Sequence, residues 1–139
     1  GDMFDCRQLL ETEAAGRAAS SQDSKGKAEL SELASSQKQF KDSVSFRIAD
    51  KEFHEKISKL AGNEMLSRLN DGLYNLGLEI RREASEDVAT VKQSVKEHML
   101  IAEAICDGDP DRARQEMTNH LVSIERSTQE IFSKQEVAS

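Results

Sequence analysis

The chain has 139 residues and a formal net charge of −7, with seven glycines and one proline. This length fits one domain, and the scarcity of turn-forming residues beside plentiful Ala, Leu, Glu, Lys and Gln favours an all-α fold. The acidic charge argues against nucleic-acid binding by this chain alone, and no apolar run of about 18 residues is present to span a membrane.

The first half of the chain predicts three helices. The first covers residues 2–20, where Arg7 and Glu11 stand four apart and predict an exposed ion pair worth at most about 0.5 kcal/mol. Its apolar side consists of Leu9, Leu10, Ala14, Ala15 and Ala18. The second covers residues 27–41 and turns inward Leu30, Leu33, Ala34 and Phe40. The third covers residues 43–61 and is expected to end at Gly62, after which Asn63 caps the next helix.

The second half predicts three more helices. The fourth covers residues 63–83 and carries the apolar stripe Leu66, Leu69, Leu73, Leu76 and Ile80. The fifth starts at Ser85 or Asp87, ends at Asp107-Gly108, and has the inward pattern Val88, Val91, Val95, His98, Ala102 and Ile105. Asp109 is a natural N-cap with Pro110 at the first helical position, and the sixth helix frays near Lys134. Its inward residues are Met117, His120, Leu121, Ile124 and Ile131. About six helices with short connections predict an antiparallel bundle.

The three histidines of the chain all fall on apolar helix faces. His54, His98 and His120 belong to three different predicted helices, and Asp50 stands one turn before His54, so that the two side chains share a face. A single inward histidine is ordinary in a core. An inward carboxylate needs a partner, however, because burying an unpaired charge costs several kcal/mol. The spacing is thus compatible with core histidines or with a shared metal site.

One carboxylate and three imidazoles are borderline ligands that suit zinc, nickel, iron or manganese. Four protein ligands on zinc would give a closed structural site. An ion with higher coordination keeps open positions for water or a small carboxylate. The residues alone do not select between these metals.

Motifs of metal-dependent hydrolysis are missing from the sequence. No HExxH occurs, and the positions three before the histidines hold Lys51, Val95 and Met117 instead of the Glu of di-iron bundles. No nucleophile stands beside a histidine, and no glycine-rich phosphate loop is present. No catalytic residue is predicted, and a metal-dependent enzyme with a bundle core or a closed structural metal bundle remain the alternatives.

The two cysteines, Cys6 and Cys106, form no metal-binding pair in the sequence. Two cysteines in a helical chain favour reduced thiols and a cytoplasmic location, although a disulfide stays open.

The order and spacing of several motifs resemble one known family over essentially the whole chain. The motifs are Phe4-Asp5-x-Arg7-x-x-Leu10-Glu11, Asp50-x-x-Phe53-His54, Ala61-Gly62-Asn63-x-x-Leu66, Glu97-His98-x-x-Ile101-x-x-Ala104-Ile105-x-x-Gly108-Asp109 and Ala113-x-x-x-Met117-x-x-His120-Leu121. They are similar to the C-terminal effector domain (FCD) of GntR-type transcription regulators of the FadR subgroup.

This resemblance implies an antiparallel bundle of six to seven helices with a metal site and a ligand site. The implied ligands of one divalent ion, with zinc expected and nickel, manganese or iron as alternatives, are Asp50, His54, His98 and His120. Arg7 maps onto a first-helix arginine suited to the carboxylate of a small organic acid, since Arg pairs with carboxylates in bidentate fashion. Arg81 and Arg47 are further candidates for contacts with this effector. The fatty-acyl-CoA sensor of the subgroup lacks the metal set, so its ligand is not transferred.

The resemblance also implies a wider protein. Residues 1–139 would form a single effector-binding and dimerisation domain, and the winged-helix DNA-binding domain that precedes it in such regulators is absent from this chain. We expect an excised effector domain, with a stand-alone homologue as the alternative. Operator DNA would be bound only through the missing domain of a homodimer, because palindromic operators mirror a two-fold axis.

Overall fold

The computed structural model describes residues 1–39 and 42–138 of the chain. In these ranges it contains seven α-helices, one 3-10 helix and no strand, so the all-α prediction is confirmed. The elements are α1 (Asp2–Ala19), α2 (Ser24–Ser36), η1 (Gln37–Gln39), α3 (Ser43–Leu60), α4 (Glu64–Leu76), α5 (Leu78–Ser85), α6 (Val88–Cys106) and α7 (Pro110–Ala138).

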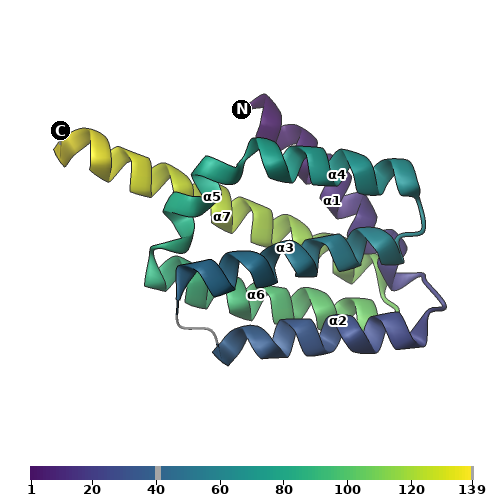
Figure 1. The fold of residues 1–139 in the computed structure, drawn as a ribbon. Coiled ribbons are helices and arrows are strands. Elements are labelled where there is room, and N and C mark those ends of the chain that lie inside the picture. Colours follow the sequence, from purple (N-terminus) through teal and green to yellow (C-terminus); the bar gives the residue numbers. More distant parts are fainter. Residues whose placement is uncertain (40–41, 139) are drawn as a thin grey trace.

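The helices form a bundle in which neighbours along the chain reverse direction (Figure 1). Helices α2, α4 and α7 run one way, α3 and α6 run the other way, and α1 crosses behind them. Short loops enforce this arrangement, as is usual for helices that are close neighbours in a bundle. Helix α7 packs against both α1 and α6, and its C-terminal turns project beyond the other helices.

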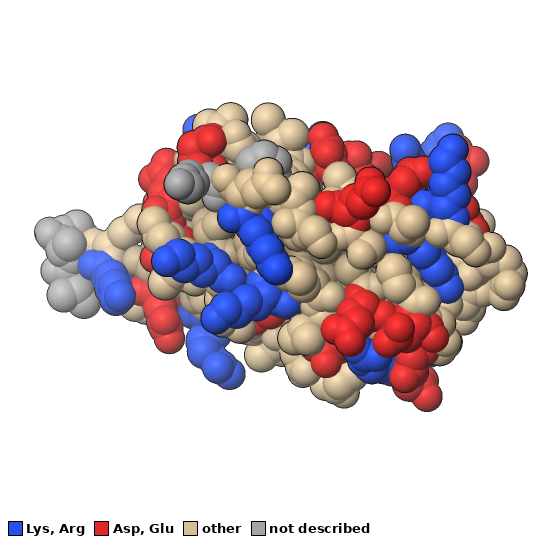
Figure 2. Space-filling view, turned by 90° about the horizontal axis from the view of Figure 1, so that it is seen from below, with Lys and Arg blue, Asp and Glu red and all other residues tan. Residues whose placement is uncertain are grey.

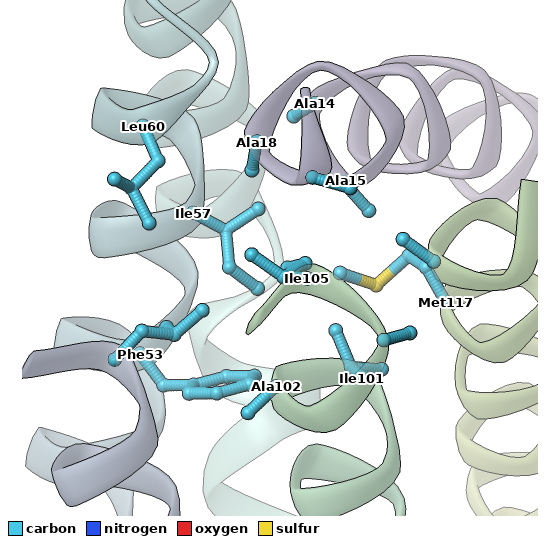
Figure 3. Close-up of a cluster of buried hydrophobic side chains, with 14 of the residues drawn as sticks. Ala14, Ala15, Ala18, Phe53, Ile57, Leu60, Ile101, Ala102, Ile105 and Met117 are labelled. Carbon is cyan, nitrogen blue, oxygen red and sulfur yellow. The ribbon is translucent and has the colours of Figure 1, made fainter. Parts of the chain in front are cut away.

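The apolar core lies where α1, α3, α6 and α7 meet (Figure 3). Alanines line the buried side of α1, which lets that helix approach large side chains of its neighbours closely. The fully buried side chains around them include Phe53, Ile57, Ile101, Ile105 and Met117. The core thus fixes the relative positions of three helices that each carry one histidine.

Several helix ends agree with the sequence. Helix α3 ends before Gly62, which adopts a φ of 74°, and the Asn63 side chain accepts a hydrogen bond from the Leu66 N–H at 3.0 Å. Asp87 is the N-cap of α6, and Asp109 accepts from the Arg112 N–H at 3.2 Å. The Asn63 and Asp109 side chains each accept from an N–H that the helix itself cannot satisfy, which is why Asn and Asp predict helix starts. The Asp87 side chain makes no such bond to a backbone N–H.

Helix α2 lies earlier in the chain than the predicted range of residues 27–41. It begins at Ser24, because the Asp23 side chain accepts from the Gly26 N–H at 2.9 Å and caps it. It ends at Ser36 and continues as the 3-10 turn η1. The prediction that Phe40 points inward falls outside the described residues.

The predicted helix over residues 63–83 is two helices. Gly77 ends α4 and precedes α5, and the change of direction turns α5 toward α6 and α7. A side chain at Gly77 would lie 3.3 Å from the Arg81 guanidinium, so the glycine also leaves room for that arginine. The break therefore helps to place a candidate ligand-binding residue.

Four residues predicted to be inward are exposed, and α7 is longer than expected. Leu9, Leu69, Leu76 and Val88 have exposed fractions of 72%, 48%, 75% and 66%. On α4 the buried positions next to the leucine stripe are Asn70 and Tyr74, since α4 turns a partly polar face to the bundle. The last helix continues to Ala138 instead of fraying near Lys134.

The surface shows no broad basic face in the view of Figure 2, where basic and acidic side chains are both present at each end of the molecule. None of the helices in the described ranges is long and apolar enough to cross a membrane. Cys6 and Cys106 are both exposed and unpaired with each other.

Two exposed glycines allow a matched test of this backbone. Gly62→Ala should lower the free energy of unfolding by about 1–2 kcal/mol, because an L-residue is strained at positive φ. Gly72→Ala, in the middle of α4 with open space around the new methyl group, should raise it by about 0.5–1 kcal/mol. Urea denaturation measures both, and equal effects at the two positions would contradict the assigned end of α3.

Candidate metal centre and effector site

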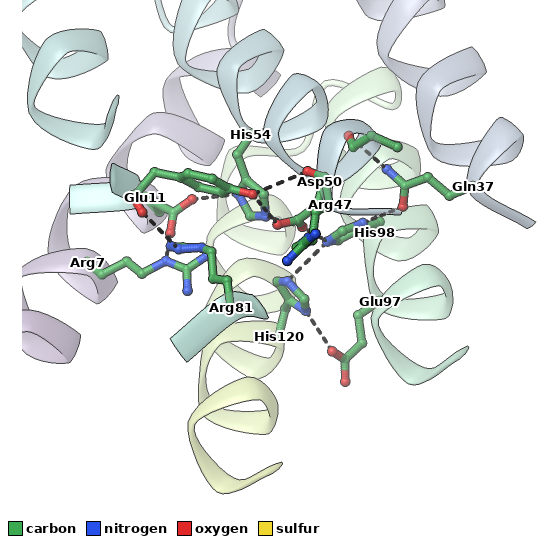
Figure 4. Close-up of polar contacts among 12 residues, drawn as sticks. Arg7, Glu11, Gln37, Arg47, Asp50, His54, Arg81, Glu97, His98 and His120 are labelled. Atoms are coloured by element: carbon green, nitrogen blue, oxygen red, sulfur yellow. Dashed lines mark hydrogen bonds and ion pairs between the residues drawn. The ribbon is translucent and has the colours of Figure 1, made fainter. Parts of the chain in front are cut away.

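Three histidines from three helices meet in the bundle interior. His54 lies on α3, His98 on α6 and His120 on α7, and one ring nitrogen of each lies within 4.8 Å of the others. Asp50 reaches the same point from α3, with its Oδ1 atom 3.3 Å from the Nε2 atoms of both His54 and His98 (Figure 4). The structure thus brings together all four residues that the sequence analysis proposed as ligands.

The Nδ1 atoms of His98 and His120 form hydrogen bonds with side-chain oxygen atoms. The Gln37 amide donates to the Ala49 carbonyl at 3.4 Å, which turns its Oε1 atom to His98 Nδ1 at 2.6 Å. A carboxylate oxygen of Glu97 lies 2.6 Å from His120 Nδ1. Since both oxygens are acceptors, each Nδ1 carries the proton. The Nε2 atoms of His98 and His120 are then unprotonated.

These two Nε2 atoms face each other at 3.2 Å. Two nitrogen lone pairs at that distance repel each other, and no proton is available between neutral rings to bridge them. A cation would turn this repulsion into attraction. Imidazole rings whose Nδ1–H groups are held by oxygen acceptors are also the usual arrangement of histidine metal ligands. The donor set therefore fits a divalent metal ion.

Charged neighbours set the protonation of His54. Its Nδ1 atom lies 2.5 Å from a Glu11 oxygen, and its Nε2 atom faces Asp50. Burial alone would lower the pKa of His54, but the two carboxylates outweigh burial and raise the pKa to about 9. Against the opposing effect of burial, Arg7 and His54 lower the pKa of Glu11, and His54 lowers the pKa of Asp50. Without a metal ion, a protonated His54 therefore supplies positive charge beside these carboxylates.

The other two histidines remain neutral. Burial is the largest influence on both His98 and His120, and it lowers their pKa values, as does the positive charge of His54. Neutral imidazole is the form that binds metals. The environment therefore keeps two of the three rings ready for a metal ion at neutral pH.

The three arginines proposed for the effector line one small cavity next to this centre. Arg7, Arg47 and Arg81 enclose about 40 Å³ together with Asp50 and His120. They come from α1, α3 and α5, which are far apart in the sequence. The cavity thus joins the metal centre to a cluster of positive charge.

The Arg7–Glu11 ion pair is buried, contrary to the expectation of an exposed pair. The side chains of Arg7 and Glu11 are only 14% and 9% exposed. Glu11 lies between two partners, with Arg7 on one side and His54 on the other. It therefore connects the arginine cluster with the histidine cluster.

Arg81 is held mainly by Tyr74. Its guanidinium lies 3.8 Å above the Tyr74 ring, and one N–H reaches the Tyr74 carbonyl at 3.5 Å. Its Nε atom is buried without a hydrogen-bond partner among the described residues. Burial, followed by the repulsion of Arg7, lowers the pKa of Arg81 to about 10. The side chain stays charged at neutral pH and would gain from a bound anion.

Sequence reasoning missed four residues of this centre: Glu11, Gln37, Tyr74 and Glu97. Glu11 carried a usable signal, because it shares a helix face with the buried Ala15 and Ala18. Glu97 is next to His98, and adjacent helix residues point about 100° apart, so one apolar face does not predict both inside; α6 is buried on more than one side. Gln37 lies in a 3-10 turn and carried no periodic signal.

Tyr74 offers a test of the polar network. Its hydroxyl donates to Asp50 Oδ2 at 3.0 Å, and the residue is only 7% exposed. Tyr74→Phe should lower the free energy of unfolding by about 1.5–3 kcal/mol, the usual loss for a hydrogen bond to a charged group. Thr12→Val, which removes a 3.4 Å contact between two neutral hydroxyls, is the control and should cost less. Equal losses in urea denaturation would mean that the tyrosine does not hold Asp50.

Comparisons with known proteins agree with this architecture. The model of the FCD domain matches residues 2–123 of the chain. Curated proteins give no match to the sequence. FCD domains bind small-molecule effectors in transcription regulators, which are not enzymes. The chain therefore belongs to the FCD domain family, the C-terminal regulatory domain of GntR-family transcription regulators.

Proposed function

We propose that this chain is a metal-containing sensor domain of a FadR-type regulator, with zinc as the expected ion. The observation that carries the proposal is the pair of unprotonated Nε2 atoms facing each other at 3.2 Å beside a carboxylate. Asp50, His54, His98 and His120 would hold the ion. Its charge would offset the cost of burying Asp50 and would attract an anionic effector.

The proposed effector is a small organic acid. The cavity beside the metal centre is lined by Arg7, Arg47 and Arg81, and its volume of about 40 Å³ suits a group of the size of a carboxylate. An arginine fork can bind both oxygens of a carboxylate at once. Asp50 and Glu11 by themselves would repel such a ligand, so the arginines and the ion together would make the cavity attractive to an anion.

The regulatory role follows from the family. In the proposed regulator, a winged-helix domain outside residues 1–139 would bind operator DNA, and the FCD domain would form a homodimer in the cytoplasm. Effector binding would change DNA affinity only to the extent that the effector prefers one arrangement of the dimer over the other. Arg7 lies on α1 and Arg81 on α5, so an acid bound between them would affect the packing of these two helices.

Metal content tests the first part of the proposal. The purified chain loaded with zinc should hold about one ion, and His98→Ala should lose it in elemental analysis. Glu97→Gln should retain the ion with roughly 10- to 100-fold lower affinity in a chelator competition, because the orienting partner of His120 is weakened. Glu52→Gln is the matched control, since it makes the same charge change at an exposed position. No ion in the unchanged chain, after zinc, nickel, manganese and iron have each been tried, would overturn the metal centre.

Arg7→Ala tests the second part. It should weaken the binding of a carboxylate such as acetate or succinate roughly 10- to 100-fold in calorimetry, because charge-assisted hydrogen bonds are lost. Metal content should stay the same. Arg17→Ala is the control, since Arg17 also lies on α1 and pairs with a glutamate four residues away, but at the surface. Metal binding with no response to any acid would indicate a closed structural site, and turnover of a bound compound would indicate an enzyme.

A further inference from the structure

The cavity beside the metal centre is too small for a whole effector. Its volume of about 40 Å³ is only a few times the roughly 10–15 Å³ that a cavity needs to hold one water molecule. A carboxylate group fills such a space, and the rest of any acid has to lie elsewhere. The neighbouring free space therefore determines which acids fit.

The same arginines also line a large cleft. It has a volume of about 650 Å³, within the range of small-molecule sites, and lies between α1, α4, α5 and α7. Arg7, Arg81, Ala84 and Ile124 line both the cleft and the small cavity. The arginine pair thus borders both spaces, and a group bound to it is adjacent to the cleft.

Most of the cleft wall is apolar, and its apolar side chains include Phe4, Leu73, Ile80, Ile124 and Phe132. Arg7 and Arg81 also line this cleft, so a guanidinium pair stands beside the apolar side chains. Such a combination suits a ligand that has one anionic group and an apolar body.

The charged side chains that line the cleft would also orient a bound ligand. Arg7 and Arg81 are its basic side chains, and Asp2, Glu125 and Glu136 are its acidic ones. A carboxylate would be attracted to the arginine pair and repelled by the acidic residues. The uncharged part of such a ligand would contact the apolar side chains of the cleft without electrostatic repulsion.

We propose that the effector is a monocarboxylic acid with a sizeable apolar body, whose carboxylate binds at Arg7 and Arg81 and whose body occupies this cleft. This inference rests on the proposed function, because it specifies the class of acid that the same arginines bind. It excludes small, strongly polar di- and tricarboxylates as the preferred ligands, because their second carboxylate would lie in the apolar part of the cleft.

Calorimetry with a graded series of acids tests the proposal on the chain, with and without zinc. Acetate, butyrate, hexanoate and octanoate share one head group and differ in apolar length. Affinity should rise along the series by up to about fourfold per added methylene, the value for full burial. Suberate, with a second carboxylate at the far end, and 1-octanol, without a carboxylate, should both bind more weakly than octanoate.

Ile80→Ala separates the cleft from the arginines. It should weaken octanoate binding by roughly tenfold through lost apolar contact and leave acetate binding unchanged. Ile48→Ala is the control, because Ile48 is an exposed isoleucine on α3 that does not line the cleft. A flat series, equal binding of 1-octanol, or a changed oligomeric state of Ile80→Ala with unaltered octanoate binding would overturn the inference.

The outcomes also distinguish this inference from the proposed function. A flat series in which all acids still bind would refute the cleft and leave the acid sensor intact. A chain-length dependence together with equal affinities in the presence and absence of zinc would support the cleft and remove the metal from effector binding. No binding of any acid would refute the sensor, and the cleft proposal with it.

Discussion

The structure depends on one constraint, the burial of three imidazoles and a carboxylate in the middle of an otherwise apolar bundle. Such a cluster is costly unless each polar atom has a partner. Gln37, Glu97 and Glu11 supply partners for the three outer nitrogens from η1, α6 and α1. What remains are the Nε2 atoms of His98 and His120, which face each other beside Asp50 and which a cation would stabilise. The apolar core around them therefore positions the ligands, and the oxygen acceptors orient them.

The site also depends on the break between α4 and α5 at Gly77. A continuous helix over residues 63–83 would carry its last turns along the direction of α4, away from α6 and α7. The break turns α5 toward the bundle, so that Arg81 lies above the Tyr74 ring and lines the effector cavity. Tyr74 in turn donates to Asp50, which links the arginine to the metal centre through one side chain. The glycine thus matters for function as well as for chain direction.

Helical periodicity was enough to predict the fold and to find the histidines, because a core position repeats every three or four residues. It failed where a helix presents polar groups to the interior. On α4, the leucine stripe was taken as the buried face, yet Leu69 and Leu76 are exposed and Asn70 and Tyr74 are buried. These polar residues are inside because Ser58 and Asp50 need hydrogen-bond partners there. Such needs arise only from contacts between helices, which a single sequence does not reveal.

Glu11 shows how the two halves of the site are physically connected. It is shared between Arg7, which faces the effector cavity, and His54, a proposed metal ligand. An ion on His54 would take over part of the charge that now balances Glu11, and an effector carboxylate would compete with Glu11 for Arg7. The proposed metal and acid would therefore act on the same carboxylate, one through His54 and the other through Arg7. Because coupling between two ligands is reciprocal, an ion that alters acid affinity must have its own affinity altered by the same factor.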